Sequence, residues 1–450
     1  MNKNFLLIYC PFIASFGAFC NGLFVGWSSQ ASIRLHETFT TKQTEWTAWI
    51  CSALALGIAV GAFTVNRLWH KVGTKKCILL SCSLMAISSI YLMIGFNCWG
   101  LFIARFVCGL ANGAIRCLIP IYIYDIVSDA QRKRMDFLLQ AQFAFGVLIV
   151  FISEYTENSY IPNIVATTVS LIFMISFGFL PESPRFLCFK RETNSAREIV
   201  AKFKNVDADI EETLRIWSQR EQIIDTNPVK ILFDGTLQLK QVVTLLGLVI
   251  FEQLIGAIST LFYMHKILNL THGEFTPEMT AILCCAIFTA GIAFPNICSY
   301  LGKTKTVLVW SSTCMAMSLG ALGIYCHLLG TLGKIDDYKV APLALLGLFY
   351  FCFAIGPHSF TWQFVQETIP VEHFFNIRNL LVAVSWIVIF AITRALPRLI
   401  DIIGVGWLFW YMSLMCLFLT IFSAVIVPEH KKLPEEKKLV YAGESSEGDV

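Results

Sequence analysis

Long stretches without charge alternate with short charged segments along most of the chain. The charge-free windows cover residues 4–33, 46–66, 77–104, 137–153, 158–181, 279–302, 306–333, 340–366, 379–393 and 402–428. A helix needs about 20 mostly apolar residues to cross the hydrocarbon core of a bilayer. The hydrophobic pattern therefore predicts a series of membrane-spanning helices.

Two further apolar stretches contain ionisable residues. One covers about 100 to 123 and includes Arg105 and Arg116, and the other lies near 241 to 264 and includes Glu252. With them the sequence predicts twelve spans. We therefore expect an all-α integral membrane protein with twelve transmembrane helices.

A polar segment divides the predicted spans into two sets of six. The predicted organisation is a six-helix half, a linker with short amphipathic helices, a second six-helix half and a tail, over residues 1–181, 182–239, 240–428 and 429–450. The halves resemble those of major facilitator transporters, which rock around a site at the middle of the membrane.

The composition supports a membrane protein and excludes several other classes. Apolar residues make up 56% of the chain and charged residues 14%, whereas soluble domains are about a quarter charged. A net charge of +3 without a basic stripe argues against nucleic-acid binding. The sequence has no metal-ligand spacing among its cysteines and no paired nucleophile and base. We expect no cofactor, no metal and no enzymatic activity.

Positive charge predicts the orientation in the membrane. Lysine and arginine residues follow the second, fourth and twelfth spans: Arg67, Lys71, Lys75, Lys76, Arg132, Lys133, Arg134, Lys431 and Lys432. Because cytoplasmic loops are enriched in these residues, both termini are expected in the cytoplasm of a cell-membrane protein. The sequon at Asn269 then lies outside and predicts a glycan.

Several motifs identify a resemblance to a known family. The sequence reads PIYIYD at 120–125, followed by Arg132, and PESPRFL at 181–187. It resembles the sugar porter family of the major facilitator superfamily, which includes glucose facilitators and insect trehalose facilitators. Weaker matches at 252–258 (EQLIGAI) and 428–432 (PEHKK) extend the resemblance over nearly the whole chain.

The resemblance implies roles for two sets of residues. A charge network at the inner ends of the spans, which controls gating, would contain Arg105, Asp125, Arg132, Glu182, Arg185 and Glu367. The substrate site would contain Gln140, Gln253, Trp362, Glu252, Arg116 and Ser385. In this set Glu252 stands where the family has a glutamine and Ser385 where it has an asparagine.

Two members of the substrate set, Arg116 and Glu252, are ionisable. Because an ionisable side chain inside a span is costly unless it is paired or hydrated, it marks a functional site by default. We expect Arg116 and Glu252 to face the central cavity and either to pair with each other or to contact a polar or charged substrate. The alternative is a structural ion pair. His265 and His358 stand alone in the sequence and are interpreted as rim or packing residues.

The predicted function is transport of a sugar, either a hexose or a trehalose-like disaccharide, by alternating access. Proton-coupled relatives carry a carboxyl group in the first span, whereas this span has Asn21. The sequence therefore favours facilitated diffusion by a monomer whose partners are the sugar and the bilayer. Two alternatives stay open: an organic-ion carrier of the related family, and a nutrient sensor with a transporter fold that does not transport.

Overall fold

The computed structural model describes residues 3–38, 44–95, 97–127, 129–156, 158, 160–203, 211, 214, 229, 232, 237–294, 304–332, 339–369 and 373–428. The regular structure in these ranges is helical. Its elements are α1 Lys3–Gly26, α2 Ser28–Thr38, α3 Thr44–Val72, α4 Thr74–Ile94, α5 Cys98–Ile126, α6 Asp129–Glu154, α7 Ile161–Gly178, α8 Pro184–Phe189, α9 Thr193–Phe203, α12 Leu239–Leu254, α13 Ala257–Leu261, α14 Met264–Thr271, α15 Pro277–Gly291, α17 Thr304–Leu332, α18 Ala341–Phe353, the π-helical turn η4 Ala354–His358, α19 Ser359–Thr368, α20 Phe374–Ile403 and α21 Val405–Val425.

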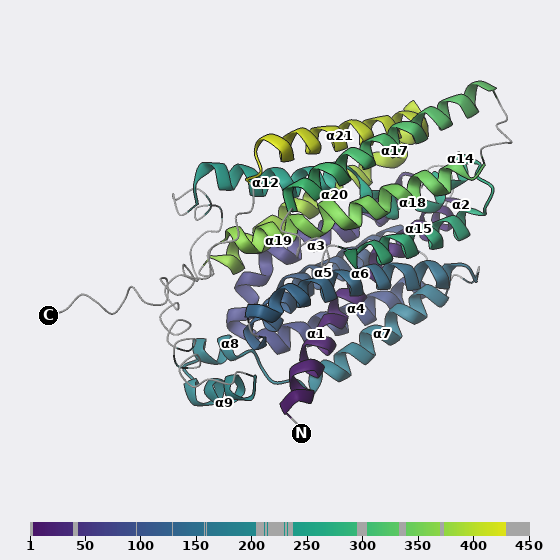
Figure 1. Cartoon of the computed structure of the whole chain (residues 1–450). Coiled ribbons are helices and arrows are strands. Elements are labelled where there is room, and N and C mark those ends of the chain that lie inside the picture. Colours follow the sequence, from purple (N-terminus) through teal and green to yellow (C-terminus); the bar gives the residue numbers. More distant parts are fainter. Residues whose placement is uncertain are drawn as a thin grey trace.

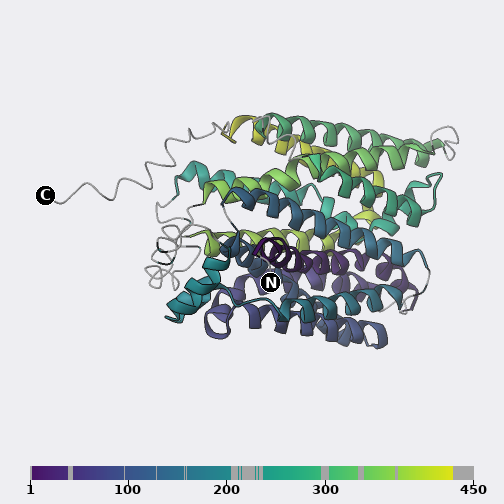
Figure 2. The ribbon, with the colours of Figure 1, turned by 60° about the horizontal axis from the view of Figure 1, so that its bottom comes forward.

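The long helices run side by side along one axis (Figures 1 and 2). Helices α1 to α7 pack mainly on one another and form the first group, and α12 to α21 form the second group. The groups meet where α3 packs against α20 and α6 against α15. We call the end of the bundle that carries α8 and α9 the linker end, and the end that carries α2 and α14 the far end (Figure 1).

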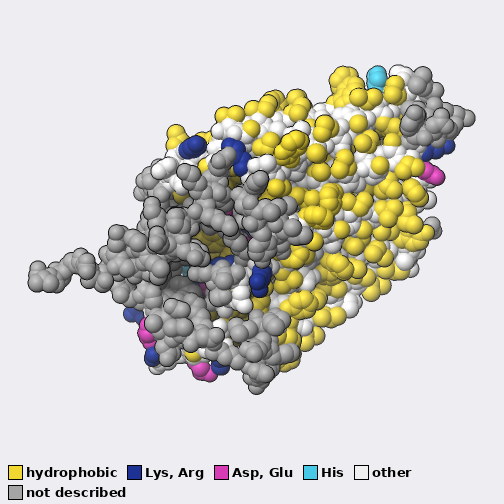
Figure 3. All heavy atoms as spheres, in the orientation of Figure 1, with side chains coloured by type: hydrophobic (Ala, Val, Ile, Leu, Met, Phe, Trp, Pro, Cys, Tyr) yellow, Lys and Arg dark blue, Asp and Glu magenta, His cyan; other side chains and the backbone are white. Residues whose placement is uncertain are grey.

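The face of the bundle seen in Figure 3 is largely apolar away from the linker end. On α4, for example, Leu80, Ile87 and Ile94 recur every seven residues and are 57%, 63% and 57% exposed. A stripe of this kind would be a liability in water but is expected against lipid. Eleven helices in the described ranges are long and apolar enough to cross a membrane, and Pro277–Gly291 is a shorter apolar helix. The all-α membrane fold is confirmed.

The boundaries of some predicted spans were wrong. The window 77–104 contains a turn, because α4 ends at Ile94 and the side chain of Asn97 accepts a hydrogen bond from the backbone N–H of Trp99 (3.2 Å) at the start of α5. Uncharged turn residues do not interrupt a charge-free window, so the pattern joined two helices.

The reverse error affects the eleventh span. The window 379–393 stops at charges, whereas α20 runs for 30 residues from Phe374 to Ile403 and includes Arg378, Arg394 and Arg398. Charge therefore marked the limits of the window but not the ends of the helix. In the eighth span α15 ends at Gly291, and the remainder of the window from 295 lies outside the described residues.

Glycines allow α3 and α5 to touch. A Cβ atom at Gly57 would overlap the carbonyl oxygen of Phe106, and one at Gly109 would overlap that of Leu54. Small residues at such crossings let two membrane helices approach backbone to backbone. This contact fixes α5, which carries several of the predicted site residues.

The polar segment after α7 begins with two short helices, α8 and α9. In α9 the side chains of Ala196, Val200 and Phe203 are buried, so the helix is amphipathic. Most of the predicted linker beyond residue 203 and the predicted tail 429–450 lie outside the described residues.

Candidate functional site

A cavity of about 80 Å³ lies at the interface of the two groups. Its walls come from α1, α5 and α6 on one side and from η4, α19 and α20 on the other. Three predicted substrate residues, Gln140, Trp362 and Arg116, line it. The structure therefore brings together residues that lie more than 200 positions apart in the sequence.

Gln140 and Trp362 face each other across the groups. The Oγ of Ser359 on α19 donates a hydrogen bond to Oε1 of Gln140 on α6 (3.0 Å). The ring of Trp362 lies 5.8 Å from the guanidinium of Arg378. An amide and an aromatic face in one cavity can bind the hydroxyl groups and the C–H surface of a sugar.

Arg116 is held by aromatic rings. Its guanidinium lies 5.4 Å from the ring centroids of both Phe143 and Trp386. These contacts place the cation over π faces, which attract it electrostatically. Within the described residues the side chain of Arg116 forms no hydrogen bond or ion pair with a protein group.

Glu252 does not pair with Arg116. Its Oε1 lies 3.4 Å from Nδ1 of His358, and both side chains are almost completely buried. His358 also lines the cavity, which agrees with its interpretation as a rim residue, but it does not stand alone because Glu252 lies beside it. The sequence did not reveal His358 as the partner of Glu252, because the two residues lie 106 positions apart and His358 is in the π-helical turn η4.

Gln253 and Ser385 are buried but are not among the residues that line the cavity. Ser385 donates a hydrogen bond to the carbonyl oxygen of Val382 in its own helix (2.8 Å). Its hydroxyl is therefore directed at the backbone in this conformation. Their predicted contact with the substrate stays a prediction.

Several cavity residues escaped the sequence analysis. Tyr124 donates a hydrogen bond to Asp136 and accepts one from Gln366, which links α5, α6 and α19. Arg378 donates to the backbone carbonyl of Arg116 (3.3 Å). Both Asp136 and Arg378 lie just outside the charge-free windows 137–153 and 379–393, so the windows did not include them in a span.

Charged residues also gather at the linker end. Arg185 and Asp125 form an ion pair (2.8 Å), and Ser183 donates a hydrogen bond to the same carboxylate (2.8 Å). Glu182 accepts from the backbone N–H of Lys75 (2.8 Å). These contacts attach the start of α8 to the end of α5 and to the first turn of α4, where a carboxylate is favoured by the helix dipole.

The turn before α4 requires a glycine. Gly73 has φ = +100°, and a Cβ atom there would lie 2.9 Å from both Oε2 of Glu182 and the ring of Phe186. Other residues rarely adopt this backbone region. The turn therefore leaves Glu182 room to reach the start of α4.

Two other predicted gating residues lie at the same end. Arg132 donates a hydrogen bond to the backbone carbonyl of Tyr124 (3.4 Å), and its guanidinium is 5.8 Å from that ring. Glu367 accepts a hydrogen bond from Gln363 in α19 (3.1 Å). Neither residue is among those that line the central cavity.

Arg105 is not part of this cluster. It precedes Asp125 by 20 residues on α5, which corresponds to about 30 Å along a helix. It is 0% exposed, donates hydrogen bonds to the carbonyl oxygen of Phe24 (3.1 Å) and to Ser28, and lies 4.5 Å from the ring of Trp27. The structure therefore separates Arg105 from the five other residues that the resemblance places in one gating network.

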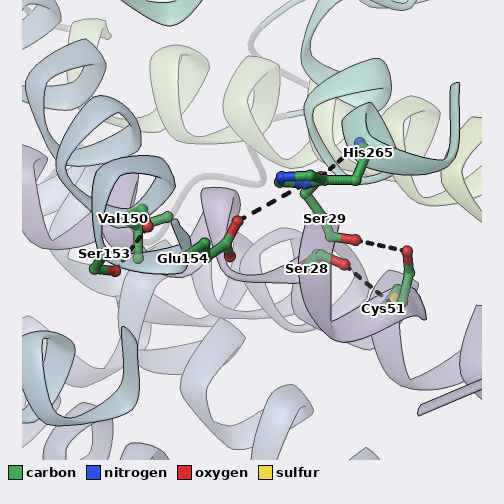
Figure 4. A network of polar contacts seen from close by, with 8 residues as sticks. Ser28, Ser29, Cys51, Val150, Ser153, Glu154 and His265 are labelled. Carbon is green, nitrogen blue, oxygen red and sulfur yellow. Dashed lines mark hydrogen bonds and ion pairs between the residues drawn. The ribbon is translucent and has the colours of Figure 1, made fainter. Parts of the chain in front are cut away.

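A second polar network closes the far end (Figure 4). Ser29 on α2 shares a hydrogen bond with Nδ1 of His265 on α14 (2.7 Å) and accepts another from its backbone N–H (3.0 Å). Glu154 lies 3.9 Å from the same ring nitrogen. His265 is therefore a contact between the two groups rather than an isolated packing residue. Asn269 is exposed on the same helix.

Amides join the two groups between the cavity and the linker end. The side chain of Asn66 on α3 donates to Asn376 (3.1 Å) and accepts from Asn379 (2.6 Å), both on α20. Contacts between the groups therefore lie on both sides of the cavity. Such contacts can be broken at one end and kept at the other, which is the requirement for alternating access.

Known proteins are similar to this chain in both sequence and fold. The family described as "Sugar (and other) transporter" matches residues 10–438. A facilitated trehalose transporter of Bombyx mori is 25% identical and aligns over 94% of this chain and 84% of its own length. The human solute carrier family 2 facilitated glucose transporter member 6 is 23% identical, over 85% of this chain and 80% of its own.

A solved structure gives the same result for the fold. The xylose transporter XylE from E. coli, in a partially occluded inward-open conformation, superposes with a TM-score of 0.80 at 17% identity, over 95% of this chain and 99% of its own. The chain is accordingly a multi-pass membrane transporter and not an enzyme. It belongs to the sugar transporter family of the major facilitator superfamily.

Proposed function

We propose that this protein carries a sugar across the membrane by facilitated diffusion. The observation that carries the proposal is the central cavity, where Gln140 and Trp362 from opposite groups offer an amide and an aromatic face. The names of the relatives, which refer to trehalose and glucose, support a hexose or a trehalose-like disaccharide.

Passive transport is favoured by the chemistry of the first helix. Asn21 lines the cavity and donates a hydrogen bond to the carbonyl oxygen of Gly17 (3.0 Å). An amide cannot change its charge with pH, so it cannot couple sugar movement to a proton. Glu252, beside His358, and Asp136, which lines the cavity, are carboxyl groups that a proton-coupled mechanism could use instead.

The proposed moving units are residues 1–181 and 240–428, joined by a linker at 182–239. We place the linker, both termini and the tail 429–450 in the cytoplasm of a cell-membrane protein that acts as a monomer. The inner gate would then involve Asp125, Arg132, Glu182, Arg185 and Glu367, which lie near the linker end. Asn269 would be outside and would carry a glycan, so peptide N-glycosidase should shift the mobility of protein expressed in eukaryotic cells.

Uptake into proteoliposomes tests the proposal. Labelled glucose and trehalose are offered to the purified protein with and without an imposed proton gradient. Saturable uptake that equilibrates and ignores the gradient is expected. Accumulation driven by the gradient would contradict facilitated diffusion and would implicate Glu252.

A second function, transport of an organic ion, is favoured by one observation. Arg116 and Arg378 place two cations in the central cavity, which a neutral sugar does not need. Saturable uptake of an organic ion without hydroxyl groups, together with no uptake of either sugar, would identify this function. Binding of a sugar without any uptake would instead identify a nutrient sensor.

A further inference from the structure

The central cavity contains two arginines without an acidic partner. In the described part of the chain neither Arg116 nor Arg378 has a carboxylate within ion-pair distance, and both line the cavity. Arg378 reaches only the backbone carbonyl of Arg116 and the ring of Trp362. Positive charge inside a membrane protein is costly unless it is paired or hydrated.

The acidic groups nearby are engaged elsewhere. Asp136 accepts the hydroxyl of Tyr124, which in turn accepts from Gln366. Glu252 lies against His358. Asp136 lines the same cavity, and Glu252 and Asp136 attract Arg116 and Arg378 through space. In the described residues, however, neither carboxylate lies within ion-pair distance of either arginine, so the N–H groups of Arg116 have no carboxylate acceptor from the protein.

The surroundings of Arg116 suit a carboxylate that belongs to a hydroxylated ring. The guanidinium of Arg116 lies over the rings of Phe143 and Trp386, and in the described residues its N–H groups have no hydrogen-bond acceptor on the protein. A guanidinium presents parallel donors that match a carboxylate. Gln140 and Trp362 in the same cavity supply hydrogen bonds and an aromatic surface for the rest of the molecule.

We propose that the substrate of this site is a sugar acid, a monosaccharide that carries one carboxylate, and that Arg116 binds this carboxylate. The inference rests on the proposed function, since it narrows the sugar to an anionic one. It does not require proton coupling.

Ligand binding to the purified full-length protein tests the inference. Sodium D-glucuronate and D-glucose are titrated by calorimetry at pH 7 and constant ionic strength. Wild-type protein should bind glucuronate more tightly than glucose. Arg116→Gln should weaken glucuronate binding at least tenfold, because it removes a charged hydrogen bond, and should change glucose affinity by less than about threefold.

Two further variants keep the test interpretable. Arg116→Lys retains the charge and should lose less affinity for glucuronate than Arg116→Gln. Arg197→Gln is the matched control, because Arg197 is 60% exposed on α9, pairs with Glu211 (2.6 Å) and lies outside the cavity; it should leave both affinities unchanged. The melting temperature of each variant shows whether it is folded.

The possible failures are distinguishable. Tighter binding of glucose than of glucuronate by the wild type, an equal loss of both ligands in Arg116→Gln, or no binding of either would overturn the sugar-acid inference. Glucuronate binding that depends on Arg116 but is not followed by uptake into proteoliposomes would instead overturn the proposed transport and support the assignment of the site.

Discussion

At the residue scale, buried cations perform two different tasks in this protein. Arg105 donates from its two terminal nitrogens to the carbonyl oxygen of Phe24 and the hydroxyl of Ser28 and so joins α1 to α2. Arg116 has aromatic neighbours and donors without protein acceptors. The same residue type therefore has a structural role on one turn of α5 and a proposed binding role three turns later.

Arg105→Ala is expected to destabilise the protein by about 3 kcal/mol, because it leaves buried acceptors without their donor and removes a cation from the ring of Trp27. Thermal unfolding in detergent, followed by tryptophan fluorescence, should show a melting temperature lower by several degrees. Arg105→Lys should not restore it fully, since a single ammonium cannot reproduce the planar fork. A melting temperature equal to that of the wild type in Arg105→Ala would contradict the structural role.

At the element scale, the packing of α3 on α5 sets the position of the cavity wall. The crossing depends on the absence of side chains at Gly57 and Gly109. The sequence shows these glycines but does not show which helix each one faces. The close approach that these glycines allow therefore depends on how α3 and α5 pack together, and neither helix shows it alone.

Two Gly→Ala substitutions distinguish the effect of helix packing on stability from the effect of helix propensity. Gly57→Ala should destabilise the protein by about 1–3 kcal/mol through overpacking, because its Cβ meets the backbone of α5. Gly330→Ala on α17 meets nothing within 4 Å and should be neutral or stabilising by up to about 1 kcal/mol. The melting temperatures of both purified variants are measured. Equal shifts in Gly57→Ala and Gly330→Ala would rule out this packing account.

At the scale of the whole molecule, the two groups touch at the far end and on the linker side of the cavity. The far-end contacts include His265 with Ser29 and an exposed ion pair between Arg398 and Glu45 (2.6 Å). Exposed pairs contribute little, so the buried His265 contact should have the larger effect on the conformational equilibrium.

His265→Phe should shift the population toward a conformation open at the far end, because it removes the side-chain bond to Ser29 while preserving stacking on Phe151. A cysteine introduced at Thr47, which lines a far-end cavity of about 380 Å³ and is 6% exposed, should react several-fold faster with an impermeant maleimide. Lys266→Ala breaks an ion pair between α14 and α20, within the second group, and serves as control. An unchanged labelling rate in His265→Phe would refute the gate.

The sequence predicted the class of fold well, because spanning a bilayer imposes a length and polarity that charge-free windows reveal. It also predicted that Gln140, Trp362 and Arg116 belong in one cavity. It did not reveal the partners of His358 and His265, because these come from distant helices. It also did not show that Arg105 lies apart from the other proposed gating residues, or that Ser385 turns its hydroxyl to its own backbone, as a serine in a helix can.

Arg116, which has no carboxylate within ion-pair distance among the described residues, has a consequence for the membrane as an electrical insulator. A potential of 100 mV amounts to about 2.3 kcal/mol for each elementary charge that crosses, so a carrier that leaked sodium or potassium would dissipate it. A fixed guanidinium at the centre of the path repels these cations whichever end is open. The residue proposed to attract an anionic sugar would thus also keep the carrier from acting as a cation channel.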